Sequence, residues 1–148
     1  MMIFLDTGPL WTICNPGAGE VGKSLRKAVL SKMAAGHIIA VAEINDYEAR
    51  REILRKNAKA QLARLEKMLT MAAYHPIDTA LMKAAAALWA QLRNAGAAGA
   101  GDHALDGDVI LVAQALRYPD HLIVTDNVKH FSGLCNVQSR TDFLLSLG

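Results

Sequence analysis

The chain has 148 residues, of which 52% are hydrophobic and 20% are charged, and its formal net charge is +2. This length and apolar content predict one domain over residues 1–148 and exclude a disordered chain, and so small a net charge does not by itself indicate a nucleic-acid partner. The two cysteines lie far apart and no apolar run approaches the length of a bilayer span, so we expect a cytoplasmic protein with neither a disulfide framework nor a membrane partner.

The first half of the sequence predicts strands that alternate with helices. MIFLD (2–6) predicts a buried strand that ends in an acid and meets a TGP turn. Apolar residues at helical spacing predict a helix from about Val21 to Ala35, and HIIAVAE (37–43) predicts a second strand. A long helical pattern then runs from Glu43 to Ala72, and we expect it to break near Asn57.

The second half continues the alternation. Asp78 is suited to cap a helix that closes at Gly96, and the glycine- and alanine-rich GAAGAG (96–101) predicts a flexible loop. A helix with a nearly all-apolar face is expected from about Asp108. The strand HLIVTD (121–126) follows it and also ends in an acid.

A closing helix is expected in TDFLLSL (141–147), with Thr141 as its cap. Strands therefore alternate with helices along the whole chain, without internal repeats or low-complexity tracts. This pattern predicts an α/β fold, a three-layer α/β/α domain around a mostly parallel central sheet. In such sheets, ligands bind beyond the carboxyl ends of the strands.

Acidic residues lie where the predicted strands end. Asp6, Glu43 and Asp126 close the three strands, and Asp106 and Asp108 precede the apolar helix. Carboxylates gathered at one edge repel one another unless a cation neutralises them, and their hard oxygens select Mg²⁺ or Mn²⁺. A metal at such a site polarises a phosphoryl oxygen and activates water for attack at phosphorus.

Each of these acids also has a purely structural interpretation. Asp6 could form a turn, and Glu43 could be a first-turn acid favoured by a helix dipole. Asp106 or Asp108 could cap a helix, and Asp126 could belong to a plain turn. These interpretations do not explain why all of the acids fall at one predicted edge.

Four segments in this order resemble the PIN-domain ribonucleases, and among them the VapC-type toxins of bacterial toxin–antitoxin pairs. They are FLDTGPLW, the AE that opens a helix near residue 43, DGDVILVAQAL and LIVTDNVKHF. The resemblance extends from Ile3 to about Phe131. It implies hydrolysis of RNA phosphodiesters with Mg²⁺ or Mn²⁺ and a metal-activated water.

The resemblance also implies roles for individual residues. The expected metal ligands are Asp6, Glu43, Asp106, Asp108 and Asp126, with Asp106 acting through the water shell of the metal. The fourth acidic position of the family falls on Asn127 in this sequence, with Asp126 beside it, so either residue could fill it. Thr7 and Thr125 could hydrogen-bond the acids or the scissile phosphate.

Basic and histidine side chains are weaker candidates. Arg50 and Arg51 follow Glu43 on the same predicted helix and could reach RNA phosphates, but a solvated helix surface explains them equally well. For His103 and His130 we favour ordinary surface or structural roles.

Two protein partners are implied by the resemblance, a second copy of the chain and a small antitoxin that lies across the acidic groove. An apolar helical stripe in excess of what the core needs would be the surface for either partner. The candidate stripes run from Leu62 to Leu69 and from Leu81 to Leu92. Core packing explains these residues equally well.

Two other functions remain open from the sequence. GAGEVGKS (17–24) matches the phosphate-binding P-loop pattern, but that loop must leave a buried strand directly, and the predicted strand has already ended at Leu5. The second alternative is a catalytically inactive PIN-like module that binds RNA or a partner.

Overall fold

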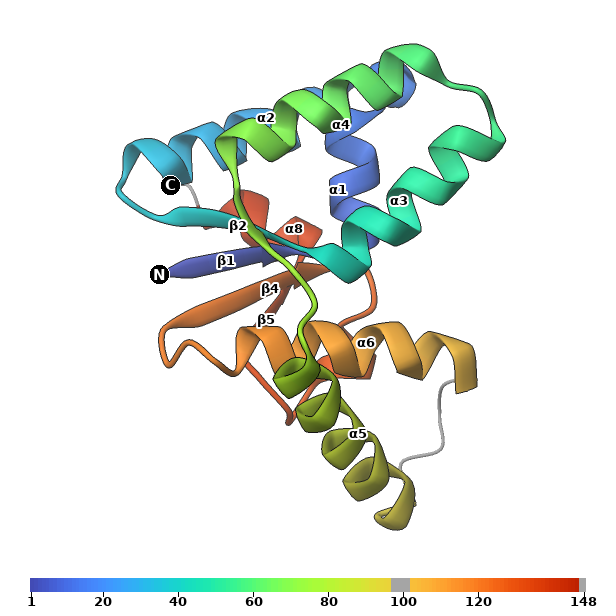
Figure 1. Ribbon diagram of the computed structural model, residues 1–148. Helices are drawn as coiled ribbons and strands as arrows, with labels where there is room; N and C mark the ends of the chain where they lie inside the picture. The colour runs from blue at the N-terminus through green and yellow to red at the C-terminus, as the bar shows by residue number, and fades with distance from the viewer. Residues whose placement is uncertain (97–101, 147–148) are drawn as a thin grey trace.

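A computed structural model of the chain describes residues 1–96 and 102–146 (Figure 1). Its centre is a sheet of five strands in the order β3-β2-β1-β4-β5, and every neighbouring pair is parallel. The strands are β1 (Met2–Leu5), β2 (Ile38–Ala42), β3 (Ala73–His75), β4 (His121–Thr125) and β5 (Val137–Ser139). The predicted parallel α/β architecture is confirmed.

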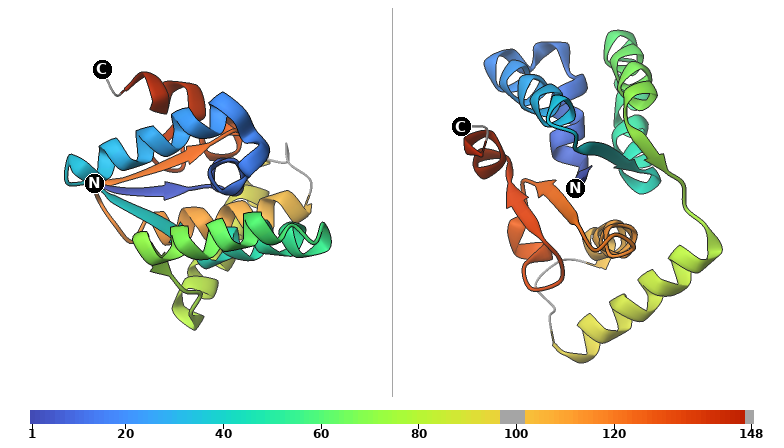
Figure 2. Two further views of the ribbon diagram at one scale, coloured as in Figure 1. Left: turned by 90° about the horizontal axis from the view of Figure 1, so that it is seen from above. Right: turned by 90° about the vertical axis from the view of Figure 1, so that its left-hand side faces the viewer.

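Helices cover both faces of this sheet (Figures 1 and 2). One face carries α1 (Thr7–Cys14), α2 (Gly19–Ala34), α3 (Glu43–Arg55), α4 (Lys59–Met71) and α8 (Arg140–Leu145). The other face carries α6 (Asp102–Ala115) and α7 (Val128–Phe131), and α5 (Thr79–Asn94) packs on α6 and projects away from the sheet (Figure 2, right). A short 3₁₀ helix, η1 (Pro16–Ala18), joins α1 to α2.

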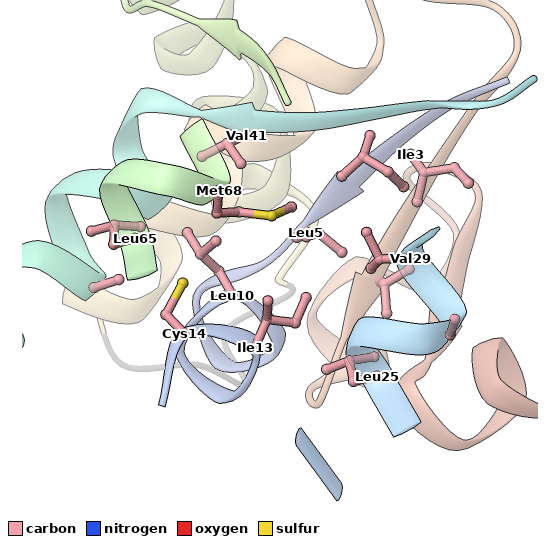
Figure 3. Packing of buried hydrophobic residues seen from close by; sticks show 14 of the residues in the cluster. Ile3, Leu5, Leu10, Ile13, Cys14, Leu25, Val29, Val41, Leu65 and Met68 are labelled. Atoms are coloured by element: carbon pink, nitrogen blue, oxygen red, sulfur yellow. The ribbon is translucent and has the colours of Figure 1, made fainter. Parts of the chain in front are cut away.

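Alternating strand residues supply the two cores, because successive side chains of a strand point to opposite faces. On β1, Ile3 and Leu5 face the larger core, where they meet Leu10 of α1 and Leu65 of α4 (Figure 3). Phe4 faces the other core, against α6 and α7. All three β1 side chains are fully buried, so the end of this strand is held in place by both layers.

The order of the strands reverses beside β1. From β1 the chain moves to β2 and β3 on one side, and then returns to β4 on the other side. The carboxyl ends of β1 and β4 thus form the topological switch point, where doubly wound sheets bind their ligands. Asp6 directly follows β1, and Asp126 directly follows β4.

The predicted turn after the first strand is wrong, because the structure has the helix α1 there. Asp6 is its N-cap, and the Thr7 amide donates to Asp6 Oδ1 over 2.8 Å. Gly8 and Pro9 resemble turn residues in the sequence, but proline is tolerated in the first turn of a helix, where its missing amide hydrogen costs nothing.

Other boundaries differ by smaller amounts. The helix expected from Val21 begins at Gly19, and the strand β3 was not predicted. The expected break near Asn57 is confirmed, since this residue adopts a φ of 52° between α3 and α4. Of the loop expected over 96–101, residues 97–101 lie outside the described part of the chain.

The helix expected from Asp108 begins at Asp102, so Asp106 and Asp108 lie inside α6 and are not its N-cap. The closing helix is capped by Ser139 and not by Thr141, because Ser139 Oγ accepts from the Asp142 amide over 3.0 Å. Among the described residues, no helix is long and apolar enough to span a membrane.

Candidate active site

Asp6 lies at the centre of a buried polar network at the switch point. Its side chain is buried, and it accepts hydrogen bonds from Thr125 Oγ1 (2.7 Å) and Asn45 Nδ2 (3.2 Å) in addition to the Thr7 amide. Burial raises the pKa of Asp6, the nearby charge of Asp126 adds to this rise, and the Thr125 and Thr7 hydrogen bonds oppose it. The network therefore fixes both carboxylate oxygens in one orientation.

Asp108 reaches the same region from α6. Burial, followed by the charge of Asp6, raises the pKa of Asp108 to about 6. His130 Nδ1 lies 2.9 Å from Asp108 Oδ2 and lowers this pKa in part. His130 was expected to have an ordinary surface or structural role, but it contacts a candidate acid. His103 was given the same expectation, and its side chain, like those of residues 102–105 in general, lies outside the described structure.

Asp126 lies in the same region, directly after the end of β4. Arg140, the first residue of α8, donates to both of its oxygens, with Nε 3.0 Å from Oδ1 and Nη2 2.5 Å from Oδ2. Gly8 makes this position possible, because a Cβ at residue 8 would overlap Asp126 Oδ2. Asn127 only follows it as the N-cap of α7 and makes no side-chain cap bond.

The backbone at Gly8 lies so close to the Asp126 carboxylate that a larger residue at position 8 should disturb the ion pair between Asp126 and Arg140. We expect Gly8→Ala to push the Asp126 side chain away from Arg140 and to destabilise the fold by up to about 1 kcal/mol, the usual contribution of a partly exposed ion pair. Gly17→Ala is the matched control, since a Cβ there would lie 3.4 Å from Asn15 Oδ1, an ordinary contact. Urea unfolding of both variants measures the difference, and equal stabilities would contradict the inferred overlap.

Glu48, which was not among the acids predicted from the sequence, joins them. Thr7 Oγ1 donates to Glu48 Oε1 over 2.9 Å, and Asn45 Nδ2 in turn donates to Thr7 Oγ1 over 3.0 Å. The charge of Glu48 also raises the pKa of Asp108. A Cβ at Gly107 would lie 3.0 Å from Glu48 Oε2, so α6 passes directly over this carboxylate.

Glu43 is not brought into this group. Its Oε1 accepts from the Ile77 amide over 3.0 Å, and its Oε2 is 3.4 Å from the hydroxyl of Tyr74, which donates more closely to Asp46 over 2.8 Å. The Glu43 side chain therefore holds the segment that joins β3 to α5. Its expected place beside Asp6 is not what the structure shows.

Asp106 also lies apart from Asp108. Two residues along a helix are about 200° apart around its axis, so the two side chains point to different sides of α6. Asp106 is exposed and lines a groove against α5, next to Met82 and Trp89. The structure thus brings Asp6, Asp108 and Asp126 together, adds Glu48 to them, and leaves Glu43 and Asp106 outside.

The donor chemistry of the four gathered residues suits a hard divalent cation, because all of their donors are carboxylate oxygens. The raised pKa values of Asp6 and Asp108 reflect burial together with negative charge that nearby acids contribute. As the side chains stand, the described residues contain no group of three or more His, Cys, Asp or Glu placed to hold a metal ion. Asp126 is turned to Arg140 and Asp108 to His130, so a cation would compete with these partners.

The arginines proposed to contact RNA differ in their surroundings. Arg50 is engaged within the protein by ion pairs to Asp46 (3.1 Å) and to Glu66 of α4. Arg51 is exposed, and its guanidinium lies 5.1 Å from the centre of the Tyr47 ring. Arg51 is thus the more accessible of the two.

The segment GAGEVGKS does not have the geometry of a P-loop. It begins inside η1, which follows the helix α1 rather than a strand, and from Gly19 onward it lies within α2. Lys23 is exposed and makes a 3.5 Å ion pair with Glu20 of the same helix. The P-loop alternative is therefore wrong, since that loop must connect a strand directly to a helix.

Three solved structures share the fold over nearly the whole chain. VapBC2 from Rickettsia felis bound to a DNA fragment from its promoter contains a chain with a TM-score of 0.74 at 18% identity, covering 94% of this chain and 98% of that one. DNA-bound VapBC from Salmonella typhimurium gives 0.73 at 16% identity, with coverages of 95% and 98%. VapBC-1 from nontypeable Haemophilus influenzae gives 0.63 at 14% identity, with coverages of 95% and 99%.

The sequence itself matches no protein-family model and no curated protein. At identities this low, the likeness shows the fold. The fold of this chain is thus one that is found in VapBC toxin–antitoxin complexes.

Proposed function

We propose that this protein is a Mg²⁺- or Mn²⁺-dependent endoribonuclease and the VapC-type toxin of a toxin–antitoxin pair. The observation that carries the proposal is the convergence of Asp6, Glu48, Asp108 and Asp126 on the switch point of the sheet. The shared fold with chains of VapBC complexes supports the same function. Within residues 1–96 and 102–146, no structural feature favours nucleotide binding instead.

The four carboxylates would hold the cation, which would polarise a phosphoryl oxygen of RNA and make a bound water nucleophilic. The remaining residues of the network position these acids. Thr125 and Asn45 orient Asp6 by hydrogen bonds to its carboxylate. The Thr7 hydroxyl links Asn45 to Glu48, because it accepts from the Asn45 amide and donates to the Glu48 carboxylate. Arg140 can exchange its bond to Asp126 for a phosphate oxygen of the substrate, because guanidinium groups bind both anions in the same fork geometry.

Cleavage of mixed RNA by the purified protein tests the proposal most directly. We expect fragments in Mg²⁺ or Mn²⁺ and none in EDTA. Intact RNA under all conditions, with the protein free of any co-purified partner, would contradict the nuclease. Such a result would favour the inactive RNA- or partner-binding module.

The pKa of Asp108 gives a prediction that needs no catalysis. Folding raises this pKa from 3.8 to about 6, so protonation of Asp108 stabilises the folded state. This stabilisation is complete below about pH 4 and is lost as the pH rises through about 6. Above that pH, we expect Asp108→Asn to be more stable than the native protein in EDTA by about 1–3 kcal/mol. Urea unfolding at about pH 4 and about pH 8 measures this difference.

The control for this experiment is Asp120→Asn. The Asp120 side chain is 81% exposed and forms a surface ion pair with the terminal amine, so its replacement should change little at either pH. Added Mn²⁺ should stabilise the native protein and leave Asp108→Asn almost unchanged. A variant no more stable than the native protein at high pH would contradict the buried charge.

An antitoxin has a suitable surface between α2 and α4. A groove of about 500 Å³ has an apolar floor that includes Val29 and Met68, and its rim carries Arg26, Arg64 and Lys67. An amphipathic helix with acidic residues beside its apolar face fits this combination. A short open reading frame directly upstream, whose product co-purifies with this chain, is the expected finding.

A homodimer is the second assembly in the proposal, and α5 is its best-supported surface. The stripe from Leu62 to Leu69 is largely used by the core, since Leu65 and Met68 are buried there. The stripe on α5 is covered less, because Met82 and Trp89 remain exposed beside a groove of about 480 Å³. Sedimentation of a Trp89→Asp variant tests this interface, and an unchanged dimer would contradict it.

A further inference from the structure

A groove leaves the carboxylate site between α1 and α3. Its volume is about 270 Å³, and its lining consists of Thr7, Gly8, Trp11, Glu48, Glu52 and Lys56. The spacing of these residues explains the groove, because positions four apart lie on the same face of a helix. One face of α1 and one face of α3 thus form its two walls.

One end of this groove belongs to the carboxylate site. Thr7 and Glu48 are joined there by a 2.9 Å hydrogen bond, and Gly8 lies against Asp126. Trp11 lies one helical turn further on, about 6 Å along the axis of α1. That separation is within the reach of one nucleotide whose phosphate lies at the acids.

The other end combines an aromatic ring with a cation. Trp11 is half-buried and packs partly against the larger core, which holds the indole in place. Lys56 is exposed, and its Nζ lies 4.7 Å from the centre of the indole ring. A ring with an exposed lysine over its face can accept another flat group in place of the lysine.

We infer that this groove binds the nucleotide next to the scissile phosphate of single-stranded RNA, with its base stacked on Trp11. This inference rests on the proposed function. Lys56 then leaves the ring and pairs with the adjacent phosphate. Aromatic side chains beside cationic ones are the usual means of binding single strands without a fixed sequence.

The charges in the groove favour a base over other occupants. Glu48 and Glu52 would repel a phosphate or an acidic peptide placed between the helices, whereas a base is neutral. Glu52 is also held by Arg55, whose Nε and Nη2 donate to its Oε2 over 3.0 and 2.8 Å. The cation that a phosphate requires is at the outer end, on Lys56.

Fluorescence tests this inference without hydrolysis. The chain has two tryptophans, so Trp89→Phe leaves Trp11 as the single reporter. In Ca²⁺, which carboxylate oxygens also bind, single-stranded RNA should quench Trp11, and an abasic ribose-phosphate chain of equal length should not. Equal quenching by both polymers, or bound RNA without quenching, would overturn the inference.

Affinity measurements on variants complete the test. Trp11→Leu keeps apolar volume but lacks an aromatic face, and we expect it to bind single-stranded RNA at least about tenfold more weakly, with Trp11→Phe recovering most of the loss. The control is Lys23→Ala, which removes an exposed side chain of α2 outside the groove. Circular dichroism establishes that each variant is folded.

The outcomes separate this inference from the proposed function. Normal affinity and cleavage in folded Trp11→Leu would refute the nucleotide site and leave the nuclease intact. Quenching of Trp11 by RNA in a protein that never cleaves would support the site and refute the nuclease.

Discussion

Replacing Asp6 with asparagine is expected to lower metal-dependent RNA cleavage by on the order of a thousandfold while the protein remains folded. Asparagine has nearly the same shape, and its side-chain oxygen can still accept from the Thr7 amide that begins α1. What it lacks is the negative charge between Asp108 and Asp126. The expected loss is therefore one of catalysis and metal affinity, and not of structure.

Single-turnover cleavage and Mn²⁺ binding, measured on the same preparations, test this expectation. Lys23→Ala is the matched control, because Lys23 is exposed and its ion pair with Glu20 lies on the surface of α2. It should cleave at the native rate. Native cleavage by Asp6→Asn would refute the carboxylate site, and a loss confined to Lys23→Ala would return attention to GAGEVGKS.

The fold was predictable where periodicity was strong, and two of the misses involve glycines. Gly8 and Gly107 look like helix breakers in the sequence, but both lie inside helices, α1 and α6. Each is where a carboxylate from a distant segment, Asp126 or Glu48, passes close to the helix backbone. Local sequence cannot reveal such contacts, because the atom that requires the glycine belongs to another element.

The candidate site was predictable as far as strand ends and, for Asp108, the start of the apolar helix determine it. Asp6 and Asp126 follow β1 and β4, so the rule for parallel sheets placed them correctly at one edge. The same rule selected Glu43, which begins α3 and is directed to the Ile77 amide instead. Glu48 was missed because its place depends on the rotation of α3, although its spacing of three from Asn45 puts both on one helix face.

Glu48 contacts the acid network and Glu43 contacts the β3–α5 connection, so we expect their replacements to affect cleavage differently. We expect Glu48→Gln to lower RNA cleavage by about a hundredfold and to weaken Mn²⁺ binding, as loss of a group in or beside a metal site usually does. The amide can still accept from Thr7 Oγ1, so the hydrogen-bonded network of Asn45 and Thr7 is kept while the charge is removed. The fold should therefore be unaffected.

Glu43→Gln is the matched substitution in the same helix. Its amide oxygen can still accept from Ile77, and we expect cleavage within about threefold of native, because the Glu43 side chain is bonded to the β3–α5 connection and not to the acids. Cleavage rates at saturating Mn²⁺ and Mn²⁺ affinities of both variants decide between the residues. Loss with Glu43→Gln and none with Glu48→Gln would restore the strand-end acid to the site and would require α3 to rotate when metal binds.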